Sequence, residues 1–407
     1  MKRIITLTAV FLLVTGTPAF LGIRGSVLSA QEAAQPQSPA PEADFFTQQF
    51  DAQTTMTGKL RVVQNAGTGG EASAEFYAHA LDRLVREYPN VRGANETRAA
   101  SDMAKLLSAK LGEAQHTDSG GNLWQVVEIF TDPLVRGEAL SALGKAQAVN
   151  YLPQVIQLLS DLNLEPGEDP MTREQTAYGA VVSLEEYKDS SGYLPVFFVT
   201  TGWYTDRTKA RAREALPKIM DNPTEPLISV IKSSSYNYAV KYGAIQTLEA
   251  SEVTAQQKSQ GAVASLTEAW RTNTNLVGQR SILANTRKLD LSMIRRYGTE
   301  DPAVYPLLER CYREGIDEEE QIAAIAALSA LATDDSARRL SSFLLDMNTR
   351  LARGTLTKED ERLVRVIIPA LGNTGRPIAR NALRAVLQAD WTGAVQRLAQ
   401  DALKKIQ

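Results

Sequence analysis

The stretch from residue 131 to residue 162, TDPLVRGEALSALGKAQAVNYLPQVIQLLSDL, decides the fold. Asp132 and Pro133 are residue types that begin a helix. Apolar residues then recur at helical spacing, and Gly144 stands where a left-handed C-cap would end this helix. After a short turn, a second apolar stripe runs from Leu152 to Leu159. Two short amphipathic helices cannot bury their apolar faces alone, so the unit must stack on copies of itself.

This unit repeats along the chain. Small or apolar residues stand three, six and seven positions after an anchor residue, and the pattern recurs about every 40 residues. One copy, between residues 276 and 296, is degenerate. A proline recurs in phase near the start of the partner helix, where its missing N–H costs nothing. The anchors are Arg136, Glu174, Lys209, Lys241, Gln321, Val364 and Gln396, and the prolines are Pro153, Pro195, Pro226 and Pro306.

The unit resembles the HEAT repeat, particularly the short HEAT-like repeats of the phycobilisome-lyase type. The resemblance rests on Asp132-Pro133, Val135-Arg136 and Ala142-Leu143-Gly144, and it extends over residues 94–406. It implies an all-α fold, an α-solenoid (superhelix) of about seven to eight stacked HEAT-like helical hairpins. It also implies partner binding and does not imply catalysis. In this family the Asp and the Arg usually tie neighbouring repeats together, and only the unit at 131–162 has both.

The N-terminal part predicts a segment organisation of 1–30, 31–73 and 74–407. Lys2 and Arg3 precede the apolar run Ile4–Val14, which is typical of a secretory signal peptide covering residues 1–30. Cleavage before Gln31 is the first expectation, and cleavage after Ala19 is the alternative. A retained anchor is a further alternative. The solenoid itself is expected to fill residues 74–407.

Residues 31–73 are expected to form a flexible Ala/Pro/Gln-rich linker and an N-terminal segment. Three phenylalanines, Phe45, Phe46 and Phe50, have helical spacing and predict a short helix on the first repeat. Residues 59–64 suggest a strand, and residues 65–70 suggest a glycine-rich loop. No Lys-Ser/Thr pair follows these glycines, so a phosphate-binding loop is not expected.

Net charge and the numbers of cysteines and histidines argue against several classes of function. The net charge is −3, and it falls to −6 without the three basic residues of segment 1–30. A mildly acidic chain lacks the electrostatic footprint of a nucleic-acid binder. The one cysteine, Cys311, can form no disulfide within the chain, and no cysteine follows the signal sequence to accept a lipid. The two histidines, His79 and His116, have no cysteine neighbours and predict no zinc site.

Aromatic and basic residues are the best candidates for a binding surface. Trp203 and Tyr204 follow a glycine in an expected loop, and Tyr236 and Tyr238 follow one unit later. Exposed Trp and Tyr are typical interface anchors, whereas the alternative is that these loop aromatics only cover the end of a repeat. Basic residues near them, and a second group near residue 290, suggest a positive stripe. The nearby basic candidates are Arg207 and Arg211, and the second group is Arg280, Arg287, Lys288, Arg295 and Arg296.

Two further segments have simpler interpretations. Residues 317–320, DEEE, are expected to cap a helix, where negative charge meets unpaired N–H groups. Residues 349–360 are expected to be an insertion, either a binding loop or a solvated one.

The sequence therefore predicts an exported scaffold or adaptor of the cell envelope, periplasmic or extracellular and not lipidated, that binds a protein partner. No catalytic, metal-binding or cofactor-binding residue is predicted, and no transmembrane span is expected after removal of the signal. Two alternatives stay open. One is an enzyme accessory or lyase-like HEAT protein, and the other is a carrier for a cell-wall glycan or lipid.

Overall fold

The computed structural model describes residues 41–69, 73–271 and 276–406. The predicted signal peptide and the linker up to residue 40 lie outside the described residues. From residue 42 onward the chain forms one compact unit. No helix among the described residues has both the length and the apolar character needed to cross a membrane.

Over the described ranges the chain forms twenty α-helices, five short 3-10 helices (η) and no strands. The helices of the first half are α1 (Pro41–Asp51), α2 (Met56–Gly69), α3 (Ala74–Glu87), η1 (Tyr88–Asn90), α4 (Ala94–Glu113), η2 (Thr117–Ser119), α5 (Gly120–Ile129), α6 (Pro133–Lys145), η3 (Val149–Tyr151), α7 (Leu152–Leu164), α8 (Pro170–Tyr187), η4 (Ser190–Gly192), α9 (Tyr193–Thr201) and α10 (Asp206–Ile219). Those of the second half are α11 (Thr224–Lys232), α12 (Tyr238–Ala250), α13 (Ala255–Arg271), α14 (Val277–Tyr297), α15 (Val304–Glu314), α16 (Glu318–Leu331), α17 (Asp334–Ala352), α18 (Lys358–Thr374), η5 (Pro377–Ala379), α19 (Arg380–Gln388) and α20 (Gly393–Lys405).

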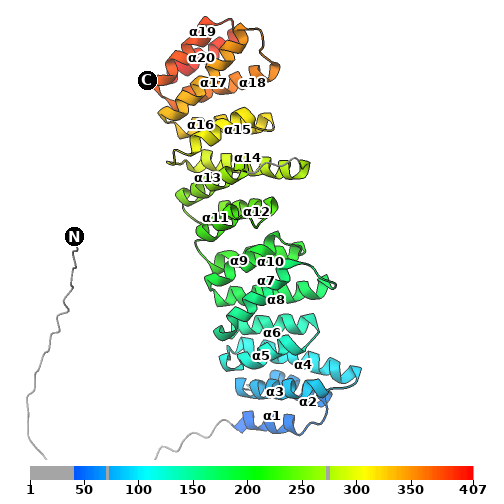
Figure 1. Cartoon of the computed structure of the whole chain (residues 1–407). Coiled ribbons are helices and arrows are strands. Elements are labelled where there is room, and N and C mark those ends of the chain that lie inside the picture. Colours follow the sequence, from blue (N-terminus) through cyan, green and yellow to red (C-terminus); the bar gives the residue numbers. More distant parts are fainter. Residues whose placement is uncertain (1–40, 70–72, 272–275, 407) are drawn as a thin grey trace, which may run out of the picture. The chain divides into compact units, whose positions relative to one another are not determined.

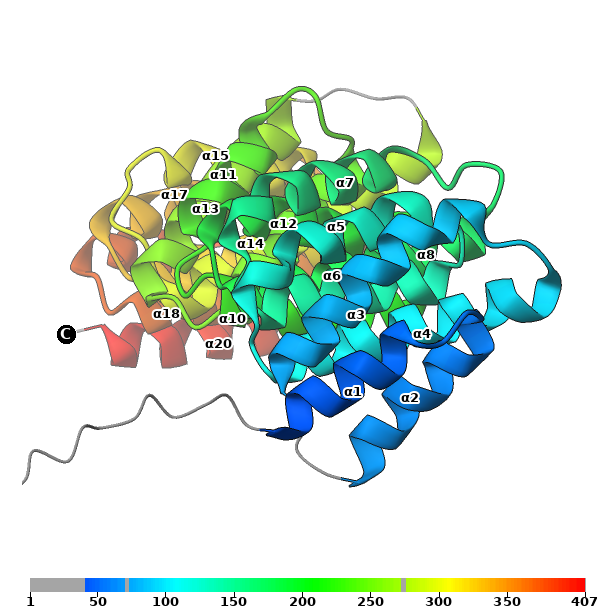
Figure 2. The ribbon, with the colours of Figure 1, turned by 90° about the horizontal axis from the view of Figure 1, so that it is seen from below.

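The helices stack in layers that follow the order of the sequence (Figure 1). Even-numbered helices pack on one another from α2 to α10 and again from α12 to α20, and odd-numbered helices pack beside them. Figure 2 shows this arrangement from below, with α1 to α4 nearest the viewer. The prediction of an all-α solenoid is confirmed.

The two periodic signals of the sequence correspond to the two rows. All seven anchor residues lie in even-numbered helices, and the degenerate copy is α14. The four recurring prolines lie in the first turns of α7, α9, α11 and α15. One continuous core of buried apolar side chains runs from Phe50 to Ile406. Each fully buried Leu or Val contributes about 1.5–3 kcal/mol to it.

The unit that decides the fold is α6, η3 and α7. Asp132 caps α6, because its carboxylate accepts a hydrogen bond of 2.9 Å from the Leu134 N–H. The prediction that Gly144 is a left-handed C-cap is wrong, because Gly144 lies inside α6 and Gln147 has the positive φ of 53°. A Cβ on Gly144 would lie 2.5 Å from the Ser183 carbonyl oxygen. The glycine therefore allows α6 to approach α8 closely.

Several expectations for loops and strands are corrected. Residues 59–64, expected to be a strand, lie inside α2, and that helix continues to Gly69 through most of the expected glycine-rich loop. The helix predicted from the phenylalanines is confirmed as α1. The expected insertion at 349–360 is mostly helical, since α17 ends at Ala352 and α18 begins at Lys358. Helical hydrogen bonding overrides weak local turn signals where neighbouring layers bury the apolar face.

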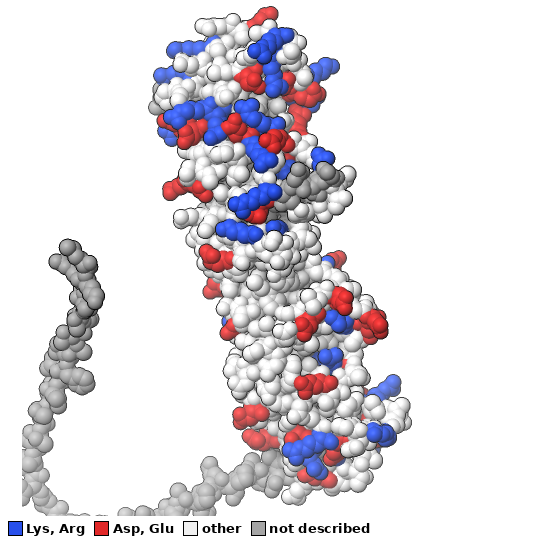
Figure 3. Space-filling model, in the orientation of Figure 1, with Lys and Arg blue, Asp and Glu red and all other residues white. Residues whose placement is uncertain are grey.

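Charge is unevenly spread over the face shown in Figure 3. Lys, Arg, Asp and Glu gather over the C-terminal layers and at the N-terminal end, and the middle layers are mostly uncharged. The acidic run caps α16 as predicted, because the Asp317 carboxylate accepts a hydrogen bond of 2.8 Å from the Glu320 N–H.

Candidate functional site

The predicted aromatic anchors lie between α9 and α10, but they are turned towards the protein. Tyr204 is only 3% exposed, and its hydroxyl donates a hydrogen bond of 2.9 Å to Asn163 Oδ1. Trp203 is half-buried, stacks on Tyr204 at 4.1 Å between ring centroids and donates from Nε1 to the Leu162 carbonyl. The expectation that this pair is exposed is wrong for Tyr204. The hydrogen bonds attach the loop to α7, because buried Tyr and Trp polar groups need partners.

The two tyrosines predicted to join this cluster lie elsewhere. Tyr236 is half-buried, and its ring contacts Phe198 of α9 at 5.0 Å between centroids. Tyr238 lines a separate pocket at the start of α12. The four aromatic residues therefore do not form one exposed surface.

The basic candidates on α10 are largely used inside the protein. Arg211 forms an ion pair with the buried Glu185, and Lys218 Nζ lies 2.6 Å from the same carboxylate. Arg207 stays exposed, with its guanidinium 5.0 Å from the centroid of the Tyr178 ring. A positive stripe on α10 is therefore reduced to few exposed charges.

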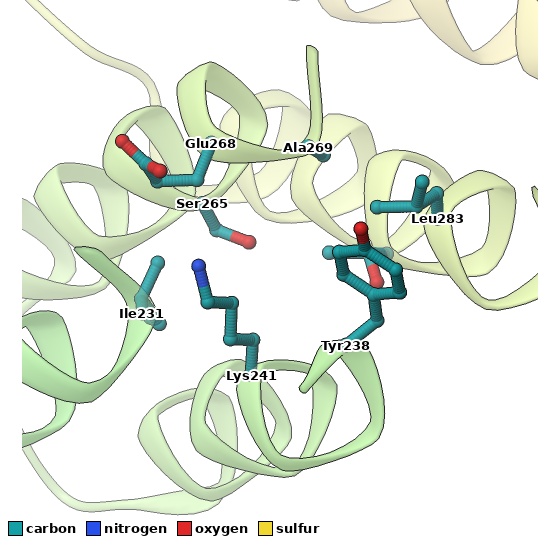
Figure 4. A pocket seen from close by; sticks show the side chains of 8 residues that line it. Ile231, Tyr238, Lys241, Ser265, Glu268, Ala269 and Leu283 are labelled. Carbon is teal, nitrogen blue, oxygen red and sulfur yellow. The ribbon is translucent and has the colours of Figure 1, made fainter. Parts of the chain in front are cut away.

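A small pocket with a mixed polar and apolar lining lies between α11, α12, α13 and α14 (Figure 4). Figure 4 shows the Lys241 side chain pointing into it from α12 towards the Ser265 hydroxyl of α13. Among the described residues, Lys241 Nζ has no hydrogen bond or ion pair. The Glu268 carboxylate is bonded to Arg271 at 2.7 Å. The cavity volume is only about 10 Å³, far below the roughly 300–1,000 Å³ of ligand pockets, so this pocket is too small for a ligand.

Beside this pocket, α14 buries a carboxylate. Asp290 is fully buried, and neither of its oxygens has a hydrogen bond of ordinary geometry among the described residues. Burial raises the pKa of Asp290 well above its usual value, although the Ser265 hydroxyl and the Arg287 charge act to lower it. A carboxyl group in such surroundings favours its neutral form.

The same helix carries a buried ion pair. The Arg287 guanidinium donates two hydrogen bonds to Glu320 of α16, at 2.5 Å from Nε and 3.0 Å from Nη2. The Trp270 ring lies between two guanidiniums, with Arg287 at 4.3 Å and Arg310 at 4.4 Å from its centroid. Trp270 Nε1 also donates to Cys311 Sγ at 3.3 Å. These contacts join α13, α14, α15 and α16.

Cys311 has a structural place in this network. It is fully buried, and burial raises the pKa of its thiol to about 12. A protonated, inaccessible thiol is a poor nucleophile. His79, which pairs with Asp51, and His116, which contacts Ser119, lie in the first layers, far from it in sequence.

An open groove lies on the even-numbered row, and we call it the α16–α18 groove. Its volume is about 550 Å³. Small and apolar side chains form its walls, among them Ala326 and Ala330 of α16 and Val366 and Pro369 of α18. An open surface of this composition suits the side chains of a bound polypeptide.

The polar groups of the groove are few. Arg295, at the end of α14, lines it and makes no hydrogen bond or ion pair with any described residue. The Ser329 hydroxyl already donates to the Ala370 carbonyl at 3.0 Å. Asn373 Oδ1 accepts from Lys405 Nζ at 2.9 Å, which leaves the amide N–H groups of this exposed residue as donors at the groove. The groove therefore presents hydrogen-bond donors around an apolar floor.

Sequence reasoning located some of these groups but not their roles. Of the basic group predicted near residue 290, Arg287, Lys288 and Arg296 form ion pairs, whereas Arg280 and Arg295 form none with the described residues. Glu320 belongs to the predicted helix cap, since its carboxylate accepts a hydrogen bond of 3.1 Å from the Ile316 N–H, and it is also the buried partner of Arg287. The groove depends on three helices at once, so no local sequence signal indicated it.

The comparisons with known proteins leave the family open. No family model matches this chain, and no curated protein has significant similarity to it. Among solved structures, human deoxyhypusine hydroxylase in complex with glycerol is similar at 15% sequence identity. The alignment covers 90% of this chain and 96% of that chain, with a TM-score of 0.23. A TM-score this low supports no conclusion about activity.

Proposed function

We propose that this chain is an exported, non-catalytic scaffold or adaptor of the cell envelope that binds a protein partner on the surface of a HEAT-like solenoid. The main support for the proposal is the α16–α18 groove, which is open, has mostly small and apolar walls and has a volume of about 550 Å³. A segment of several residues fits such a space. Extended area and a few buried side chains would supply the affinity.

The chemistry of the interior supports a binding role over a catalytic one. The cysteine is buried with a raised pKa, and the orphaned Asp290 lies fully inside the protein. A catalytic group must reach its substrate within hydrogen-bonding distance. The groove, by contrast, offers surface and carries no acid–base pair among its lining residues.

Site-specific photo-crosslinking in native cells tests this function. A photoreactive residue replaces Ala330, which is exposed in the groove, and in a matched variant replaces Ala210, which is exposed on α10 beside the basic residues predicted from the sequence. We expect one stoichiometric protein adduct from position 330 and none from position 210. An adduct from position 210 alone would shift the binding surface to α10. No protein adduct at either position would contradict a protein-binding scaffold.

A further inference from the structure

The α16–α18 groove carries a net positive side-chain field. Arg295 and Lys405 flank it, and no carboxylate is among the residues that line it. Arg295 is exposed, and no described residue pairs with it. Its charge is therefore available to a ligand that enters the groove.

The acidic residues at the start of α16 lie at the opposite end of that helix and are paired, and Asp334, two residues after the lining Ala332, faces Arg376 at 3.9 Å. Glu318 pairs with Arg362 at 3.0 Å, and Lys288 pairs with the neighbouring Asp317 at 2.7 Å. Ala330 lies twelve residues after Glu318, which is about 18 Å along a helix axis. Two screened ion pairs at that distance weaken the attraction of Arg295 for an anion very little.

The remaining polar groups complete the pattern. The Asn373 amide N–H groups are donors, and the Ser329 proton is already engaged by the Ala370 carbonyl. A ligand that offers acceptors and negative charge at the rim would satisfy these donors. A ligand that offers donors or positive charge would leave them unpaired and repel Arg295.

We infer that the occupant of the groove is a polypeptide segment that places small apolar side chains on the alanine-rich floor and carboxylates against Arg295 and Lys405. This inference rests on the proposed function and adds the chemical class of the partner. Arg295 would act as a rim charge, which mainly speeds association and selects acidic partners over basic ones.

The test combines the crosslinker at position 330 with charge reversal. Arg295→Glu should lower the adduct yield about tenfold, because one attraction is replaced by one repulsion. Arg295→Lys should retain most of the yield. Arg213→Glu is the matched control, since Arg213 is exposed on α10 and lies outside the groove, and it should leave the yield unchanged. Mass spectrometry of the crosslinked peptide should find Asp or Glu beside small apolar residues.

The outcomes separate the two claims. An adduct at position 330 that survives Arg295→Glu, or that joins a basic segment, would overturn the acidic class and leave the protein-binding function standing. An adduct from position 210 alone would overturn the acidic occupant of the groove and leave protein binding standing, and absence of an adduct from both positions would overturn both claims. Circular dichroism of each variant verifies the fold, which we expect to be unchanged because the substituted arginines are exposed.

Discussion

Two junctions between neighbouring layers differ in how they are held together. At the first, α6 crosses α8 so closely that a Cβ on Gly179 would lie 2.5 Å from Gly137 Cα. Polar contacts add to this junction, since Gln147 Nε2 donates to the Glu186 carbonyl at 2.7 Å. The backbone of one layer therefore fits directly against the backbone of the next.

The second junction, which we call the seam, lies between α9–α10 and α11–α12. It is held by apolar contacts, such as the Phe198–Tyr236 ring pair and the approach of Gly243 to Thr201. Between residues 41–219 and 224–406 no hydrogen bond or ion pair is found among the described residues. Apolar contacts are non-directional, whereas hydrogen bonds and close backbone contacts specify one geometry. The seam is therefore the place where we expect one half of the solenoid to move or unfold separately from the other.

The largest expected effect comes from breaking a polar connection on the C-terminal side of the seam. Glu320→Ala leaves the buried Arg287 without its partner and should cost about 3–5 kcal/mol of unfolding free energy. Urea unfolding measures this loss. Glu319→Ala is the control, because Glu319 is 82% exposed and its pair with Lys288 is worth about 0–1 kcal/mol. Equal losses of unfolding free energy in the two variants would show that the buried ion pair contributes no more than the exposed one.

A smaller loss should follow when the close α6–α8 crossing is spread apart. Gly179→Ala forces a methyl group against the Gly137 backbone and should cost about 1–3 kcal/mol. Peptide-resolved hydrogen exchange should show faster opening from α4 to α10 and little change from α13 to α20, because the seam limits transmission. Gly278→Ala has nothing within 4 Å and should be neutral or stabilising by about 0.4–1 kcal/mol. Uniform acceleration across both halves would contradict an independent seam.

The buried carboxyl group of Asp290 should make the free energy of unfolding depend on pH. The pKa of Asp290 is raised in the folded protein relative to the unfolded chain. The stability that comes from the protonated carboxyl is therefore fully present below about pH 3.9, and the free energy of unfolding falls as pH rises towards the folded pKa. Asp290→Asn removes this dependence. We expect the stability of the wild type relative to the variant to fall between pH 4.5 and pH 7 by about 1 kcal/mol or more. Parallel stability curves for the two proteins over this range would refute the raised pKa.

The smallest effect is expected at the seam itself. Tyr236→Ala removes the ring contact with Phe198 and should cost about 0.5–1.5 kcal/mol. Small-angle scattering should detect a broader distribution of sizes, because the remaining apolar contacts allow sliding. A loss as large as that of Glu320→Ala, with an unchanged size distribution, would show that the seam is as rigid as the other junctions.

The sequence by itself determined the repeat, the helix pairs and the assignment of residues to the two rows. This was feasible because helical periodicity, capping aspartates and first-turn prolines act within one or two turns of the chain. Arg136 and Pro153 thus marked α6 and α7 correctly. The prediction of an exposed aromatic surface around Trp203 and Tyr204 was wrong because these signals are only local. A position in a loop does not show which neighbouring helix a side chain contacts.

Only the tertiary structure decided what each polar residue does. Glu320 and Arg287 are 33 residues apart and meet because α14 and α16 are adjacent layers. Arg295, two turns further along α14, lines the groove instead and is unpaired among the described residues. Gly144 has a role in close packing that its place near a helix end concealed. Burial, ion pairing and groove formation depend on three or more helices in register, and no local pattern of residue types contains that register.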